Sequence, residues 1–254
     1  MRHQWHLFLC ALQFLTRIPT PTLTAFEPDW IARSARFYPV VGGLVGTISG
    51  LVFLMSHHVW SGFVSAALAI AVGIIITGGF HEDGLGDTAD GLGGGLNPER
   101  RLEIMKDSRI CSFGTLAIWS VLSIKLMTLA ALPAWSGMFA LVIAHTMARA
   151  CSVVVMHAFP YARDSGTSKI KPTPNGVTLN EAFIGLGFGL LSLYAFSEDL
   201  IHALLAFLFA TISTFLLARL SRRLIGGWTG DVLGAIEQCA ELAILLGLSM
   251  RLGV

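Results

Sequence analysis

Three aspartates in the segment GGFHEDGLGDTADGLGGG have a spacing that suits metal chemistry. Asp83, Asp87 and Asp90 stand at positions i, i+4 and i+7. At about 100° per residue, their side chains fall within about 60° of one another on a helix. Like charges on one helical face repel unless a cation lies among them, and Mg²⁺ binds carboxylates and bridges substrate phosphates. The spacing therefore predicts a magnesium-binding helix, with Glu82 beside it as a further ligand.

The acidic segment directly follows the apolar run 61–77 and is interrupted by glycines. Acidic side chains at the mouth of a membrane helix are costly and are usually functional. Glycines disfavour a helix, but they allow a bulky ligand or a neighbouring helix to approach closely. The alternative is a solvated acidic loop between two helices. His81, next to the aspartates, is a candidate ligand, base or substrate contact.

A second acidic group lies in GGWTGDVLGAIEQCAEL. Asp231, after the glycines, is a candidate metal ligand. Glu237 and Glu241 share a helical face one to two turns into a predicted membrane span. Carboxylates at that depth need a cation, a metal or a proton, and Lys125 and Arg149 are the candidate cationic partners. Two interpretations stay open, namely a structural buried ion pair or contact with metal or substrate.

Basic side chains are candidates for holding substrate phosphate. Arg149 stands four residues after His145, and its guanidinium fits phosphate oxygens in a bidentate manner. A salt bridge is the alternative for Arg149. Lys106 and Arg109 either bind a pyrophosphate or belong to an amphipathic helix whose cations reach the membrane surface. Arg163, in the next polar loop, is a further predicted contact.

The composition indicates a polytopic membrane protein. Of the 254 residues, 54% are hydrophobic and only 13% are charged, whereas soluble domains carry about 25% charged residues. A net charge of +1 provides no basic field for nucleic acid. The four cysteines form no CxxC pair, which is typical of reduced packing thiols and not of a disulfide framework or a zinc site.

The apolar runs predict an all-α bundle, a single integral membrane domain over residues 1–254, with about seven transmembrane helices. Gly42, Gly43, Gly46 and Gly50 form a small-residue stripe for helix contact in the first span. The N-terminal apolar run is too short to cross a bilayer and lacks a cleavage site, which predicts an interfacial or re-entrant helix. The predicted spans are residues 37–55, 61–77, 112–132, 137–157, 181–196, 200–218 and 232–250.

The lysine and arginine residues in the connections between the predicted spans all lie on one side of the predicted membrane. They lie before the first span and in long polar connections, such as 20–36 and 219–230, whereas the short turns 56–60, 133–135 and 197–199 have none. The positive-inside rule therefore predicts a cytoplasmic position for the acidic segment and every long loop. Polar chemistry on one face favours an enzyme acting on cytoplasmic substrates over a transporter, whose site lies at mid-membrane.

Carboxylates and basic side chains on one face are the combination that phosphoryl-type transfer needs. Metal ions neutralise the pyrophosphate, basic side chains hold the non-bridging oxygens, and a carboxylate takes the proton of an attacking hydroxyl. The motifs FHEDGLGDTADG, RLEIMKDSR, YAR and GGWTGD followed by two glutamates resemble, in order, those of the cobalamin synthase (adenosylcobinamide-GDP ribazoletransferase) family. FLTRIPTP and FYPVVGGLVG near the start also match, so the resemblance covers nearly the whole chain.

The resemblance implies a Mg²⁺-dependent transferase in the cytoplasmic (inner) membrane of a prokaryote. It would join adenosylcobinamide-GDP to α-ribazole or α-ribazole 5′-phosphate and release GMP. The ribazole 3′-hydroxyl would attack the phosphate attached to cobinamide. Asp83, Asp87 and Asp90 would hold metal on the pyrophosphate, and the second acidic group would have a supporting metal or base role.

Two other functions stay open. A CDP-alcohol phosphotransferase has related chemistry, but its usual pattern of DG, then AR, then a G and two D-x₃-D aspartates over a longer span does not occur here with that spacing. A transporter could use Lys125, Arg149 and the two glutamates along a path, but it would leave the position of the aspartates unexplained. Self-association into a homo-oligomer is also open.

Overall fold

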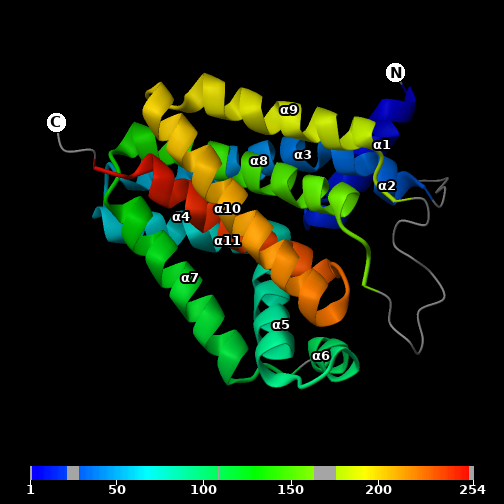
Figure 1. Cartoon of the computed structure of the whole chain (residues 1–254). Helices are drawn as coiled ribbons and strands as arrows, with labels where there is room; N and C mark the ends of the chain where they lie inside the picture. The colour runs from blue at the N-terminus through cyan, green and yellow to red at the C-terminus, as the bar shows by residue number, and fades with distance from the viewer. Residues whose placement is uncertain (1, 22–28, 108, 163–175, 252–254) are drawn as a thin grey trace.

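The computed structural model describes residues 2–21, 29–107, 109–162 and 176–251, and these are almost entirely helical (Figure 1). The predicted all-α membrane bundle is confirmed. In chain order the elements are α1 (Arg2–Leu15), α2 (Trp30–Ser34), the 3₁₀ helix η1 (Ala35–Phe37), α3 (Tyr38–Ser56), α4 (Gly62–Thr77), α5 (Phe80–Gly94), α6 (Pro98–Met105), α7 (Ser112–Ala130), α8 (Ala134–Ala158), α9 (Leu179–Phe196), α10 (Leu200–Ile225) and α11 (Gly230–Leu248).

Helix α8 is the centre of the bundle, and α3, α9 and α11 pack around it (Figure 1). Helix α3 approaches α8 closely because its contact face is made of glycine. A Cβ on Gly46 or Gly50 would stand 2.6 or 2.8 Å from a backbone carbonyl oxygen of α8. The predicted small-residue stripe is therefore a helix contact.

Fewer helices than predicted have the length and composition of a membrane span. Among the described residues there are five, namely Trp30–Ser56 and helices α7 to α10, against the predicted seven or so. The number becomes six if α4 and α5 form one broken span. Helix α4 has only 16 residues, and α11 carries Asp231, Glu237 and Glu241. Both helices nevertheless form where spans were expected.

Two connections differ from the sequence-based expectation. Helix α10 continues to Ile225, so the basic residues between 219 and 223 lie on its last turns instead of in a loop. The connection predicted over 20–36 contains α2 and the start of η1. The predicted N-terminal helix is confirmed as α1, whose Leu7 and Leu15 are buried. The position of α1 at a membrane interface stays a prediction.

A sharp bend of 89° separates α4 from the acidic helix α5. Gly78 and Gly79 permit it because both have a positive φ, +71° and +70°, which side chains with a Cβ rarely tolerate. A Cβ on Gly78 would also lie 2.5 Å from Arg17 Nε. The bend directs α5 toward α11, where a Cβ on Gly84 would be 2.8 Å from the Asp231 carbonyl oxygen.

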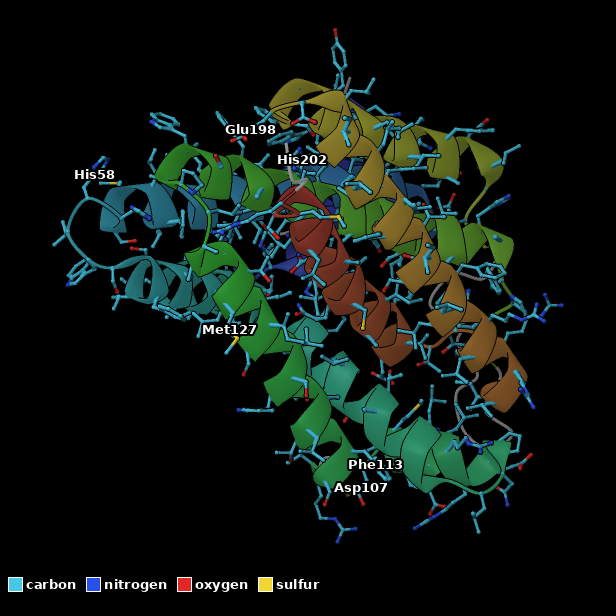
Figure 2. All side chains as sticks on the ribbon, turned by 60° about the vertical axis from the view of Figure 1, so that its left-hand side comes forward. His58, Asp107, Phe113, Met127, Glu198 and His202 are labelled. Carbon is cyan, nitrogen blue, oxygen red and sulfur yellow. The ribbon has the colours of Figure 1, made fainter. Side chains whose placement is uncertain are left out.

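The two ends of the molecule are well separated. Figure 2 shows Asp107 and Phe113 at the tip of the lobe that α5, α6 and the start of α7 form. His58 in the α3–α4 turn, Glu198 in the α9–α10 turn and His202 in the first turn of α10 lie far from this tip. The acidic helix and the short turns therefore occupy opposite parts of the bundle.

Gly46→Ala is expected to lower the melting temperature of the purified protein in detergent. The added methyl would press on the Leu141 carbonyl oxygen, and overpacking of this kind costs about 1–3 kcal/mol. Gly187→Ala is the matched control, because nothing lies within 4 Å of a Cβ there. Equal melting temperatures for the two variants in a thermal-shift assay would contradict the close α3–α8 contact.

Candidate active site

Asp83 and Asp87 lie on one helix, as predicted, close to the first turn of α11. Asp87 is half-buried, and the negative charges of Asp83, Asp231 and Asp90 repel its carboxylate. Asp83 is exposed and acts on Asp231 as well. Within the described part of the chain, the side chains of Asp83 and Asp87 form no ion pair. We call Asp83, Asp87 and Asp231 the acid face.

The five predicted metal ligands are divided among three places. Asp83, Asp87 and Asp231 form the acid face, whereas Asp90 and Glu82 each turn to other partners. In residues 2–21, 29–107, 109–162 and 176–251, no three His, Cys, Asp or Glu side chains converge closely enough to hold one metal ion. The described carboxylates of the acid face therefore do not form a closed metal-binding cage by themselves.

Asp90 caps the first turn of α7. Its Oδ2 accepts a hydrogen bond from the Cys111 N–H at 2.7 Å, and its Oδ1 accepts one from the Gly114 N–H at 2.8 Å. The first amides of a helix have no partner within the helix, so a carboxylate from elsewhere stabilises them. A Cβ on Gly114 would overlap Asp90 Oδ2. Both Asp90 oxygens are thus used to hold α7 against α5.

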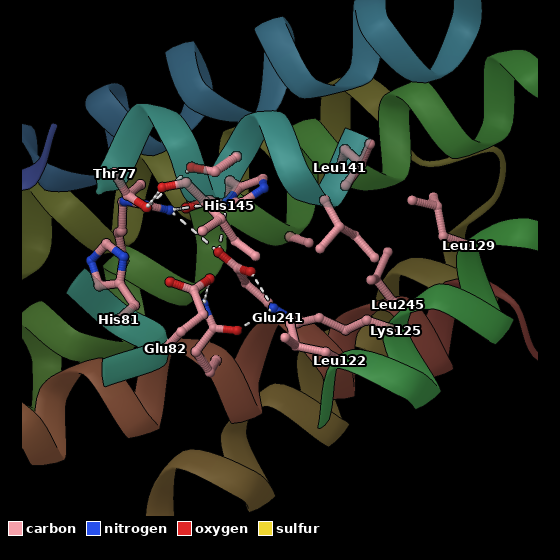
Figure 3. A pocket seen from close by; sticks show the side chains of 16 residues that line it. Thr77, His81, Glu82, Leu122, Lys125, Leu129, Leu141, His145, Glu241 and Leu245 are labelled. Atoms are coloured by element: carbon pink, nitrogen blue, oxygen red, sulfur yellow. Dashed lines mark hydrogen bonds and ion pairs between the residues drawn. The ribbon is translucent and has the colours of Figure 1, made fainter. Parts of the chain in front are cut away.

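Glu241 lies in a buried charged cluster between α5, α7, α8 and α11 (Figure 3). Three side chains contact its carboxylate. Lys125 Nζ is 2.6 Å from Oε2, while His145 Nδ1 and Arg149 Nη1 are 2.6 and 3.5 Å from Oε1. Lys125, His145 and Arg149 come from two neighbouring helices, so Glu241 joins α11 to both α7 and α8.

Glu237 extends the same cluster toward α5. Its Oε1 lies 2.8 Å from Arg149 Nη2 and its Oε2 lies 3.0 Å from His81 Nε2. These are ion-pair contacts without the alignment of a hydrogen bond. Arg149 is 1% exposed and Glu237 is 3% exposed, so neither reaches solvent. Of the two interpretations of the glutamates, this geometry favours the buried ion pair.

Gln238, which no motif in the sequence indicated, links the buried cluster to α5. Its Oε1 accepts a hydrogen bond from Lys125 Nζ at 2.7 Å, and its Nε2 donates one to Glu82 Oε1 at 2.9 Å. Glu82 is therefore turned toward the interior and not toward the acid face. Its spacing could have indicated this role, because Gln238 stands three residues before Glu241 and therefore on the same buried face of α11.

The predicted phosphate contacts are spread over different environments. Arg149 and His81 belong to the buried cluster. Arg109 is exposed, and its Nη2 lies 2.6 Å from Asp107 Oδ2. Hydrogen bonds from the Arg109 side chain and backbone N–H lower the pKa of Asp107 to about 2. Lys106 is exposed at the end of α6. The fifth predicted contact, Arg163, lies outside the described residues.

The loop that precedes Asp231 is clamped to the segment that follows α8. Tyr161 and Trp228 pair as a parallel β-bridge, and the Trp228 N–H donates to the Pro160 carbonyl at 3.0 Å. Gly227 is required here because a Cβ would overlap the Pro160 oxygen. Burial, together with the nearby Asp231 carboxylate, raises the pKa of Tyr161. Tyr161 and Ala162 of the YAR motif thus meet the GGWTGD motif beside the acid face.

A family model described as cobalamin-5-phosphate synthase matches residues 7–249. The chain is 41% identical over 252 residues to the adenosylcobinamide-GDP ribazoletransferase of Leptothrix cholodnii, covering 96% of this chain and 95% of that protein. It is 41% identical over 256 residues to the protein of that name from Shewanella pealeana, covering 100% and 98%. The chain belongs to the cobalamin-5-phosphate synthase family. No solved structure matches it.

Membership of the cobalamin-5-phosphate synthase family confirms the resemblance drawn from the motifs. The protein is a transferase of cobalamin biosynthesis with multi-pass membrane helices. In this member of the family, FHEDGLGDTADG forms most of α5, while GGWTGD forms the clamped loop and the start of α11. The motifs that carry the resemblance therefore build the acid face and its supports.

Lys125→Met is expected to lower the melting temperature strongly, because it leaves the Glu241 carboxylate with weaker compensation inside the bundle. Breaking a buried pair by removing one partner costs about 3–5 kcal/mol. The double variant Lys125→Met/Glu241→Gln removes both charges and should be more stable than the single variant. Thermal unfolding in detergent measures both. A double variant less stable than Lys125→Met would contradict a dominant Lys125–Glu241 pair.

Asp90→Asn is expected to destabilise the start of α7, because an amide nitrogen cannot accept a backbone hydrogen bond. An unsatisfied buried group costs about 1–3 kcal/mol. Asp83→Asn is the matched control, since it removes an exposed charge from a group of like charges and should keep or raise stability. Amide hydrogen exchange over residues 111–115 measures the effect. Unchanged protection in Asp90→Asn would show that Asp90 does not cap α7.

Proposed function

We propose that this chain transfers the cobinamide phosphate of adenosylcobinamide-GDP to α-ribazole or α-ribazole 5′-phosphate and releases GMP. The full-length similarity to proteins named for this reaction supports the proposal. The observation that carries it is the acid face, whose carboxylates stand together at one end of the bundle without a cationic partner among the described residues.

Mg²⁺ is the proposed cofactor, and the acid face fits it chemically. Asp83, Asp87 and Asp231 are hard oxygen donors whose charges repel one another. Mg²⁺ in enzymes of this kind is usually held by one or two carboxylates together with substrate phosphates and water, and not by a closed protein cage. An open set of carboxylates suits that mode of binding. The bound ion would neutralise the pyrophosphate and stabilise the leaving phosphate.

The transfer balances as an exchange of two phosphorus–oxygen bonds. The 3′-hydroxyl oxygen of the ribazole bonds to the phosphorus attached to cobinamide, and the bond from that phosphorus to the oxygen that leaves with GMP breaks. A carboxylate of the acid face takes the hydroxyl proton. Lys106, Arg109 and Arg163 remain the proposed cationic contacts for the phosphates. Glu237 supports the site from inside by holding Arg149 and His81.

The proposed location of the reaction is the cytoplasmic face of a prokaryotic inner membrane. The basic residues at the ends of α6 and α10 lie on the side of the acid face, as the positive-inside rule requires for a cytoplasmic end. The relatives named above come from bacteria. We also propose that the whole chain acts as one integral membrane domain.

Purified protein in detergent, supplied with adenosylcobinamide-GDP, α-ribazole 5′-phosphate and Mg²⁺, is expected to release GMP and form the corrinoid product. EDTA should abolish turnover and added Mg²⁺ should restore it. Asp87→Asn should lower kcat by about two orders of magnitude, because it removes a metal ligand next to the reacting phosphate. Chromatography of both products measures the rate.

Glu103→Gln is the control for charge removal, since Glu103 is exposed on α6 and pairs with Arg100. It should turn over like the wild type. Normal turnover in Asp87→Asn together with loss in EDTA would keep the transferase but reject Asp87 as a metal ligand. No turnover by folded wild-type protein would overturn the proposed function, and CDP-alcohol donors would then be tested.

A further inference from the structure

The last turns of α10 carry three arginines that the proposed reaction does not use. Arg219, Arg222 and Arg223 stand at positions i, i+3 and i+4, so they share one face of the helix. All three are exposed. Within the described residues no carboxylate pairs with any of them. Three neighbouring guanidinium groups repel one another and form an incomplete site for anions.

The helix surface that leads to these arginines is apolar and uncovered. Only 17% of the apolar 18-residue stretch of α10 is buried inside the bundle, the lowest share among the five candidate spans in the described residues. Phe215, Leu216 and Leu220 are 53%, 60% and 44% exposed. A lipid-facing surface that ends in cations has the polarity profile of a phospholipid, with acyl chains below and phosphate at the membrane surface.

The end of α10 is also connected to the acidic helix. Arg101 on α6 donates from Nη1 to the Leu224 carbonyl at 3.3 Å, which caps the end of α10. The Arg101 carbonyl oxygen in turn lies against Gly91 of α5, 2.9 Å from where a Cβ would be. Helix α6 contacts both α5 and α10, and Figure 1 shows it next to the end of α10 and to α5. A ligand that orders the end of α10 would therefore also steady α6 and α5.

We propose that Arg219, Arg222 and Arg223, which we call the arginine triad, bind the phosphate of an anionic phospholipid whose acyl chains lie along α10. Guanidinium groups bind phosphate oxygens in bidentate pairs. A soluble phosphate would neutralise the same charges, but it would make no contact with the exposed apolar face next to the triad. The continuity of apolar and cationic surface therefore favours a lipid over a soluble phosphate compound.

Full-length protein in nanodiscs tests the proposal without any turnover assay, so its outcome is independent of the proposed transferase activity. Wild-type protein is compared in phosphatidylcholine alone and with added phosphatidylglycerol, and lipid that stays bound is counted by native mass spectrometry. Phosphatidylglycerol should remain bound and should raise the melting temperature. Arg219→Gln/Arg222→Gln/Arg223→Gln should weaken this binding by about fivefold for each arginine removed.

The control variant Arg33→Gln/Arg100→Gln/Arg251→Gln removes the same charge elsewhere and should retain the lipid. If the triple triad variant does not fold, the three single variants should each show a part of the loss. Equal retention of phosphatidylglycerol by the triad variants and the wild type would overturn the proposal. Stabilisation by inorganic phosphate or GMP in phosphatidylcholine nanodiscs, without retention of phosphatidylglycerol, would also overturn it in favour of a soluble ligand.

Discussion

The pairing of Arg149 with Glu237 and Glu241 is the interaction on which the rest of the structure depends. An arginine that is 1% exposed in an apolar bundle persists only if carboxylates neutralise it, because an isolated buried charge is very costly. The two glutamates fix α8 to α11, and their other contacts, Lys125 and His81, bring in α7 and α5. One electrostatic requirement therefore orients four helices.

Local patterns in the sequence predicted those features that depend on helical period and composition. The helix that carries Asp83 and Asp87 and the cationic partners of the glutamates could be predicted in this way. The role of Asp90 could not, because its contact with α7 exists only after the bend at Gly78 and Gly79 turns α5 by 89°. The hydrogen bonds of Gln238 to two other helices likewise depend on packing between distant segments.

The end of α10 shows a different limit of sequence-based prediction. Hydropathy falls at Arg219, which marks the edge of an apolar run but not the end of a helix. The helix ends where Gly226 adopts a φ of 88°, the left-handed cap that glycine favours. Composition therefore located the boundary between apolar and polar surface, while backbone conformation located the end of the element. The same distinction applies to α11, which is helical despite three carboxylates.

Helix α11 unites two groups of carboxylates with opposite surroundings. Glu237 and Glu241 are neutralised inside the bundle, whereas Asp231, about 9 Å from Glu237 along the helix axis, has no basic partner among the described residues. Its place in the first turn is favourable because the helix dipole stabilises negative charge there. Since one rigid helix carries both groups, the charges buried in the membrane domain also set the position of the acid face. The buried ion pairs of the membrane domain thus hold Asp231, which has no basic partner among the described residues, in place at the end of the bundle.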